Sequence, residues 1–176
     1  MKVLLFIETE LLQLGGKPVR DCLGCNRCAE NGQCVFSEDV VNLWIRKARQ
    51  ADGFVFGSPV YFAHPTGQML AVMDRLFYAG GDAFAHKPAA AVVTARRAGT
   101  TASLDVLTKH FTNAQMPVVS STYWNMVFGP APEQVVLDQE GLQTMRNLGR
   151  NLAWLLQCIQ AGREQGLLPP EAEHRD

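Results

Sequence analysis

The sequence predicts an α/β fold in which helices cover both faces of a parallel sheet. Short apolar segments with strand composition alternate with longer segments that repeat apolar residues at helical spacing. Strands of a parallel sheet are buried on both faces, so they read as continuous apolar runs, and helices connect them. At 176 residues the chain is long enough for one domain with a full core.

Strand-like and helix-like segments follow one another along the chain. The predicted strands are 2–5, 7–14, 54–56, 89–94 and 117–120. The predicted helices are 40–51, 66–78, 101–113 and 141–159. We therefore expect a five-stranded parallel sheet in a domain over residues 1–161, followed by a C-terminal tail over residues 162–176.

The first two predicted strands follow each other without a connection. Neighbouring parallel strands need a crossover of about a dozen residues or more. Phe6 and Ile7 are adjacent in the sequence, so either the two runs merge into one long strand or about 25–30 residues are missing between them. We expect a missing segment, with an interrupted backbone at the Phe6–Ile7 junction and an incomplete first βα unit.

Four of the five cysteines lie within thirteen residues, in the spacing C-x2-C-x2-C-x5-C. Glycine and asparagine residues between them allow the backbone to curl, so that the thiols can converge as an iron–sulfur cluster requires. Structural zinc sites more often use two separated pairs. The residues alone leave a cluster, zinc and a metal-free loop open as interpretations of Cys22, Cys25, Cys28 and Cys34.

The remaining composition limits the partners and the compartment. A net charge of -1 and a pI near 6.4 predict neither a nucleic-acid partner nor an anionic membrane surface. No apolar run reaches the roughly 18–20 residues of a membrane helix. We recognise no secretory leader, so we expect a cytoplasmic protein without disulfides. The fifth cysteine, Cys158, falls in a helical pattern, and we expect it to be buried.

Two predicted loops follow strands at the sheet edge where parallel α/β domains bind ligands. The loop over residues 57–65 carries Tyr61 and Phe62, which are exposed there unless a flat ligand covers them. The loop over residues 94–100 carries Arg96 and Arg97, for which a solvated basic pair is the simpler interpretation. Each loop leads into a helix N-terminus, where free N–H groups favour an electron-rich or anionic ligand.

These residues carry a resemblance to a known family. Gly57-Ser-Pro-Val-Tyr-Phe62, together with the Asp74-Arg75 pair, resembles the flavin-binding region of the flavodoxin-like NADPH-dependent FMN reductases. Cys22-Leu-Gly-Cys-Asn-Arg-Cys28 is similar to the iron–sulfur flavoprotein branch of that family. The resemblance implies a flavodoxin-like fold and FMN contacts at Ser58, Pro59, Val60, Tyr61, Phe62, Ala63, Ala95, Arg96, Arg97 and Gly99.

The resemblance also implies an activity. It points to an FMN-dependent oxidoreductase that passes electrons from NAD(P)H or a reduced carrier to a small acceptor such as a quinone or flavin. Alternatives are an electron-transfer iron–sulfur flavoprotein whose four clustered cysteines bind a [4Fe–4S] cluster, and a flavodoxin-like module that has lost its cofactor. The last is suggested by a departure from the family, because the sequence has no recognisable phosphate-binding loop.

Two spatial expectations complete the interpretation. Family members often pair so that a neighbour covers the flavin, so we expect a homodimer or homotetramer, with residues 123–128 in the interface. The cysteine segment follows the second predicted strand, so we expect it at the same sheet edge as the flavin loops.

Overall fold

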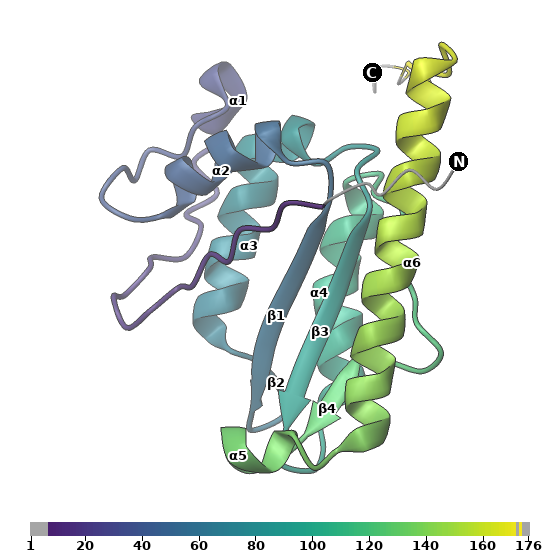
Figure 1. Cartoon of the computed structure of the whole chain (residues 1–176). Coiled ribbons are helices and arrows are strands. Elements are labelled where there is room, and N and C mark those ends of the chain that lie inside the picture. The colour runs from purple at the N-terminus through teal and green to yellow at the C-terminus, as the bar shows by residue number, and fades with distance from the viewer. Residues whose placement is uncertain (1–6, 172, 174–176) are drawn as a thin grey trace.

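The computed structural model describes residues 7–171 and 173 (Figure 1). Its elements run in the order α1 (Cys28–Asn31), α2 (Val41–Gln50), β1 (Phe54–Tyr61), β2 (His64–Pro65), α3 (Gly67–Gly80), the 3-10 helix η1 (Gly81–Ala83), β3 (Ala89–Ala95), α4 (Thr100–Asn113), β4 (Met126–Phe128), α5 (Pro132–Val135) and α6 (Gln139–Glu164). None of the helices described is long and apolar enough to cross a membrane.

The described strands form one mixed sheet in the order β2-β1-β3-β4. β1 pairs in parallel with β3 from Phe54↔Ala89 to Pro59↔Thr94, and β3 pairs in parallel with β4. The short strand β2 folds back against the end of β1 in antiparallel orientation. The α/β, flavodoxin-like prediction is thus confirmed in its coarse form, but the described sheet has four strands instead of five and is not wholly parallel.

The predicted strand over residues 7–14 is wrong. These residues form no strand, and Leu11 is almost fully exposed. Of this segment, Leu14 packs against the core, and Glu10 forms an ion pair with Lys47 on α2. An apolar run does not become a strand without a neighbouring strand to supply its hydrogen bonds. The expected interruption at the Phe6–Ile7 junction involves Phe6, which lies outside the described residues.

The predicted strand over residues 117–120 is reduced to a single bridge between Ala89 and Val118. The following backbone turns toward α6 instead of continuing along β3. Asn151 donates a hydrogen bond to the Ser120 carbonyl, and the Ser121 hydroxyl donates to the Thr144 carbonyl. The chain returns to the sheet at β4, which the sequence pattern did not indicate.

The main core lies on the face of the sheet that α2, α3 and α4 cover. Here Phe54 and Phe56 of β1 meet Phe77, Phe84 and Phe111, with ring centroids 4.6 to 6.4 Å apart. Aromatic pairs at this spacing contribute about 0.5–1.5 kcal/mol each beyond the burial of their area. The cluster therefore fixes α3 and α4 against β1.

The opposite face of the sheet is covered only in part. Ala90 and Val92 of β3 pack with Leu148, Leu152 and Leu155 of α6, which runs along the β3 and β4 side in Figure 1. On β1 the same face is open, and Val55 is 54% exposed. In the described part of the chain, α6 therefore covers this face over β3 and leaves it open over β1.

The long helix α6 corrects two further expectations. It ends at Glu164, past the predicted helix end at residue 159. Cys158 is exposed, not buried. The residues of α6 that pack against the sheet are Leu148, Leu152 and Leu155. Cys158 lies outside this apolar stripe of the helix.

We predict that Gly80 is required for the close approach of α2 and α3. A Cβ at Gly80 would lie 2.8 Å from Cγ2 of the buried Ile45. Alanine improves helix propensity by about 1 kcal/mol, but overpacking a core typically costs about 1–3 kcal/mol. Gly80→Ala should therefore lower the free energy of unfolding, measured by urea denaturation.

Gly67→Ala is the matched control on the same helix. A Cβ at Gly67 meets no atom within 4 Å. Its free energy of unfolding should stay within about 0.5 kcal/mol of the wild type. If Gly80→Ala were as stable as this control, the two helices would not be in tight contact.

Candidate functional site

The cysteine-rich segment curls against the C-terminal half of α3. Gly24, Asn26 and Gly32 have φ values of 62°, 56° and 65°, in the left-handed region that tight turns require. All four clustered cysteines line one small cavity, whose wall on the helix side includes Arg75 and Tyr78. The four cysteines thus border one cavity, as their spacing predicts. Their convergence on a common cluster and their role as ligands remain predictions.

The sulfur atoms have defined hydrogen-bond partners. The Gly24 backbone N–H donates to Cys22 Sγ at 3.4 Å, and the Arg75 Nε–H donates to Cys34 Sγ at 3.1 Å. The Cys28 thiol donates to the Tyr78 carbonyl at 3.6 Å. Each described cysteine is a free thiol. N–H donors to ligand sulfurs are one of the features by which proteins tune iron–sulfur clusters.

Four thiols border this cavity, and cysteine sulfur is the ligand that iron–sulfur clusters require. Among the described residues, no three His, Cys, Asp or Glu side chains are drawn together as the ligands of one metal ion would be. The cavity volume is about 20 Å³, which is room for roughly one water molecule. The four cysteine sulfurs can therefore hold a cluster only if the exposed wall of the cavity, residues 23–26, moves outward.

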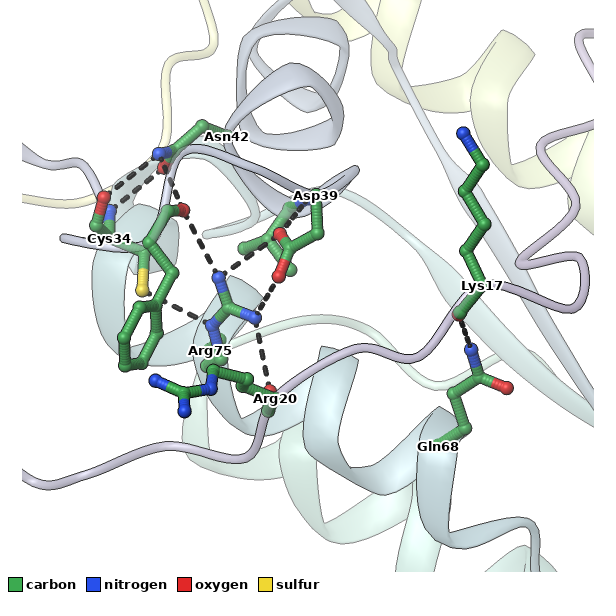
Figure 2. A network of polar contacts seen from close by, with 9 residues as sticks. Lys17, Arg20, Cys34, Asp39, Asn42, Gln68 and Arg75 are labelled. Carbon is green, nitrogen blue, oxygen red and sulfur yellow. Dashed lines mark hydrogen bonds and ion pairs between the residues drawn. The ribbon is translucent and has the colours of Figure 1, made fainter.

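Arg75 joins this segment to α2 and α3 (Figure 2). It is 1% exposed, and its guanidinium donates to both carboxylate oxygens of Asp39, at 2.5 and 3.1 Å. Two more bonds go to the carbonyls of Arg20 and Phe36, at 3.0 and 3.3 Å. Burial alone would lower the pKa of Arg75, but the hydrogen bonds to Asp39 and Cys34 outweigh it and raise the pKa above its ordinary value.

In the sequence, Arg75 is identified only as part of the Asp74-Arg75 pair that carries the family resemblance. A signal was present, because Arg75 interrupts the apolar stripe of α3, where Met69, Val72, Met73 and Leu76 are all buried. A charged residue among buried helix positions needs a partner of opposite charge. The pattern does not name that partner, because Asp39 is 36 residues away in the sequence.

The first predicted flavin loop is partly a strand. β1 continues through Tyr61, so Ser58, Pro59 and Val60 belong to the sheet and not to a loop. The turn into β2 is tight, with Phe62 at φ 63° and a hydrogen bond from the Ala63 N–H to the Tyr61 carbonyl. Pairing with β2 extends the strand beyond the predicted apolar run of 54–56.

The predicted flavin residues lie at the end of β1 and at the β3–α4 turn. Ser58 is buried, and its hydroxyl donates to the Pro59 carbonyl and accepts from the Thr66 N–H, so it holds the strand end to α3. Tyr61, Phe62 and Ala63 are exposed at the first turn, and Arg96 and Arg97 are exposed at the second, which Ala95 precedes as a buried residue.

The structure brings the two turns into contact at Gly99. This residue has φ 83°, and a Cβ there would lie 2.8 Å from Val60 Cγ1 and 3.2 Å from Ala63 Cα. The contact brings the turn that carries the exposed Tyr61 and Phe62 close to the turn that carries the exposed Arg96 and Arg97.

A large groove lies beside β1, between that strand and residues 7–15. Its volume is about 1590 Å³, above the usual 300–1,000 Å³ of a small-molecule site. Of the predicted flavin residues, Ser58, Pro59 and Tyr61 line it, and the others lie outside. The groove follows from the open side of the sheet.

The cysteine cavity and the two turns lie at opposite ends of α3, and the expectation of a shared sheet edge is wrong. Cys28 contacts Tyr78 near the C-terminal end, while Ser58 binds Thr66 at the N-terminal end. A helix of 14 residues spans about 20 Å at about 1.5 Å per residue. In Figure 1, α1 and β2 accordingly mark opposite ends of the molecule.

Comparison with known proteins agrees with this geometry. Residues 3–131 match the family model of the NADPH-dependent FMN reductases. An iron–sulfur flavoprotein of Methanocaldococcus jannaschii is 34% identical over 162 residues, covering 88% of this chain and 83% of that protein. An iron–sulfur flavoprotein of Methanosarcina thermophila is 27% identical over 164 residues, covering 90% of this chain and 83% of that protein.

We predict that Gly99→Ala separates the two turns. The substitution adds both left-handed backbone strain, about 1–2 kcal/mol, and a clash with Val60 and Ala63 of about 1–3 kcal/mol. Gly166→Ala is the control, because Gly166 has φ 82° and no atom near its added Cβ. Urea denaturation should show a larger loss of unfolding free energy for Gly99→Ala. Equal losses would mean that strain alone acts and that the contact is unimportant.

Proposed function

Because the chain belongs to the NADPH-dependent FMN reductase family, in the branch of the iron–sulfur flavoproteins, we propose that it passes electrons from NAD(P)H or a reduced carrier to a small acceptor such as a quinone or flavin. Membership of the family makes it a flavoprotein oxidoreductase. The observation that carries the finer proposal is the contact between the two turns at Gly99, within the matched residues 3–131.

The chain's own residues would bind and orient the flavin. FMN, when bound, supplies hydride and single-electron chemistry that side chains lack. Tyr61 and Phe62 offer flat apolar surfaces for the ring system, and the adjacent basic pair Arg96 and Arg97 offsets negative charge on it. Gly99 has no side chain and so keeps the second turn close to the first.

The four clustered cysteines are proposed to hold a [4Fe–4S] cluster as a second cofactor. Three observations support this: the shared cavity, the N–H donors to Cys22 and Cys34, and the iron–sulfur relatives. An outward movement of the exposed residues 23–26 would give the cluster room. A module that has lost its cofactor is not favoured, because the family match covers both turns.

We also propose a cell compartment and an oligomeric assembly for the protein. Free thiols at all described cysteines suit a cytoplasmic location. Tyr123 and Trp124 are exposed beside each other, with ring centroids 5.1 Å apart, and they are proposed to lie in the interface of a homodimer or homotetramer. Aromatic residues are enriched in such interfaces.

We expect the double variant Tyr61→Ala/Phe62→Ala to bind FMN more weakly. Each aromatic contact contributes about 0.5–1.5 kcal/mol beyond its buried area. Together they should raise the dissociation constant of FMN about fivefold or more, measured by quenching of flavin fluorescence. Trp154→Ala is the control, because Trp154 is also exposed but lies on α6. Unchanged FMN affinity in the double variant would place the flavin elsewhere.

A cluster should depend on Cys34 and not on Cys158. After anaerobic reconstitution with iron and sulfide, the wild type should contain about four iron atoms per chain and absorb near 400 nm. Cys34→Ser should lose most of that iron, because one of four ligands is removed. Cys158→Ser removes an exposed cysteine of α6 and should retain the iron. A wild type without iron would leave a flavin-only reductase.

A further inference from the structure

Arg75 uses its whole hydrogen-bonding capacity inside the protein. The five N–H groups of a guanidinium match the five bonds that Arg75 donates: two to Asp39, two to backbone carbonyls and one to Cys34 Sγ. The Asp39 carboxylate balances the charge, with one oxygen at each terminal nitrogen. The Nε–H, the remaining donor, points at the sulfur (Figure 2).

Cys34 is held more firmly than the other three clustered cysteines. Asn42 of α2 accepts from the Cys34 N–H and donates to the Cys34 carbonyl, both at 2.8 Å. Together with Arg75, this fixes the backbone and the sulfur of Cys34 from two different helices. By contrast, Cys25 is exposed on the outer wall of the cavity. The wall can therefore open while Cys34 stays in place.

We infer that Arg75 is a positioning residue that orients Cys34 and raises the reduction potential of the cluster through its Nε–H···Sγ hydrogen bond. The inference rests on the proposed function, because it requires the cluster. If these cysteines hold a cluster, its one-electron reduction would add negative charge to the sulfur ligands. A fixed donor at Cys34 stabilises that reduced state relative to the oxidised one, and hydrogen bonds to ligand sulfurs are an established means of setting such potentials.

The test compares reduction potentials of the anaerobically reconstituted full chain, titrated with dithionite and followed by electron paramagnetic resonance. Asp39→Asn/Arg75→Gln removes both buried charges together, and an asparagine oxygen can still accept from the Val41 N–H at the start of α2. In this double variant, with the iron content unchanged, the equilibrium constant for one-electron reduction should fall about tenfold. This corresponds to a reduction potential that is lower by about 59 mV. Arg75→Lys should fold more readily and lower the constant several-fold, because an ammonium group lacks the fork that serves Asp39 and Cys34 together.

Arg20→Gln is the matched control. The Arg20 guanidinium lies 5.1 Å from the centre of the Phe36 ring, similar to the 5.2 Å of Arg75, but it is exposed and donates no bond to Cys34. The reduction potential of the Arg20→Gln variant should equal that of the wild type. The backbone carbonyl of residue 20 can still accept the hydrogen bond from Arg75.

The outcomes separate the two proposals. A wild type that binds no iron removes the proposed cluster, and this inference with it. A loaded wild type with loaded variants of unchanged potential overturns this inference alone and leaves Arg75 with a purely structural role. If the double variant does not fold, Arg75→Lys decides in the same way. The inference would also be overturned if Arg20→Gln lowered the reduction potential as much as the Arg75 variants do. Loss of a nearby positive charge would then explain the shift without the hydrogen bond to Cys34.

Discussion

The buried ion pair between Arg75 and Asp39 is the centre of the contacts that hold residues 20–39 to α3. Residues 7–27 contain no helix or strand, so backbone hydrogen bonding within that segment does little to fix it. One guanidinium on α3 binds the Arg20 carbonyl, the Phe36 carbonyl and the Asp39 carboxylate at the start of α2. Removing one partner of such a pair typically costs about 3–5 kcal/mol, because the other charge is left buried and uncompensated. The position of the cysteines therefore depends on a residue outside their own segment.

The parts of the fold that could be predicted are those with long periodic or apolar patterns. The helices around residues 41–50, 67–80 and 100–113 and the strand at 89–95 lie within a residue or two of their expected bounds. Residues 7–14 look like a strand, yet a groove separates them from β1, and they pair with no strand of the described chain. β1 is longer than predicted because β2 folds back on it. A proline at position 59 is tolerated because, among the described residues, no strand pairs with most of the other edge of β1.

The candidate site also has features that could be predicted from the sequence and features that could not. The spacing of the cysteines and the glycine and asparagine residues between them predict a curled segment, since those are local properties. The position of that segment is not local: Cys34 and Arg75 are 41 residues apart, and only the packing of α2 against α3 brings them together. Ser58 shows the reverse case. Its motif indicates a ligand contact, while its hydroxyl is occupied by the backbone of Pro59 and Thr66.

The open side of β1 has a consequence for the behaviour of the protein in solution. A strand with free N–H and C=O groups along one edge is a template for sheet growth between molecules, which leads to aggregation. Here two features shorten that template. Pro59 has no N–H to offer an incoming strand, and the β2 hairpin already occupies Val60 and Tyr61. Among the described residues, the stretch from Phe54 to Ser58 then remains for an added strand, so a new ladder could not run the full length of β1.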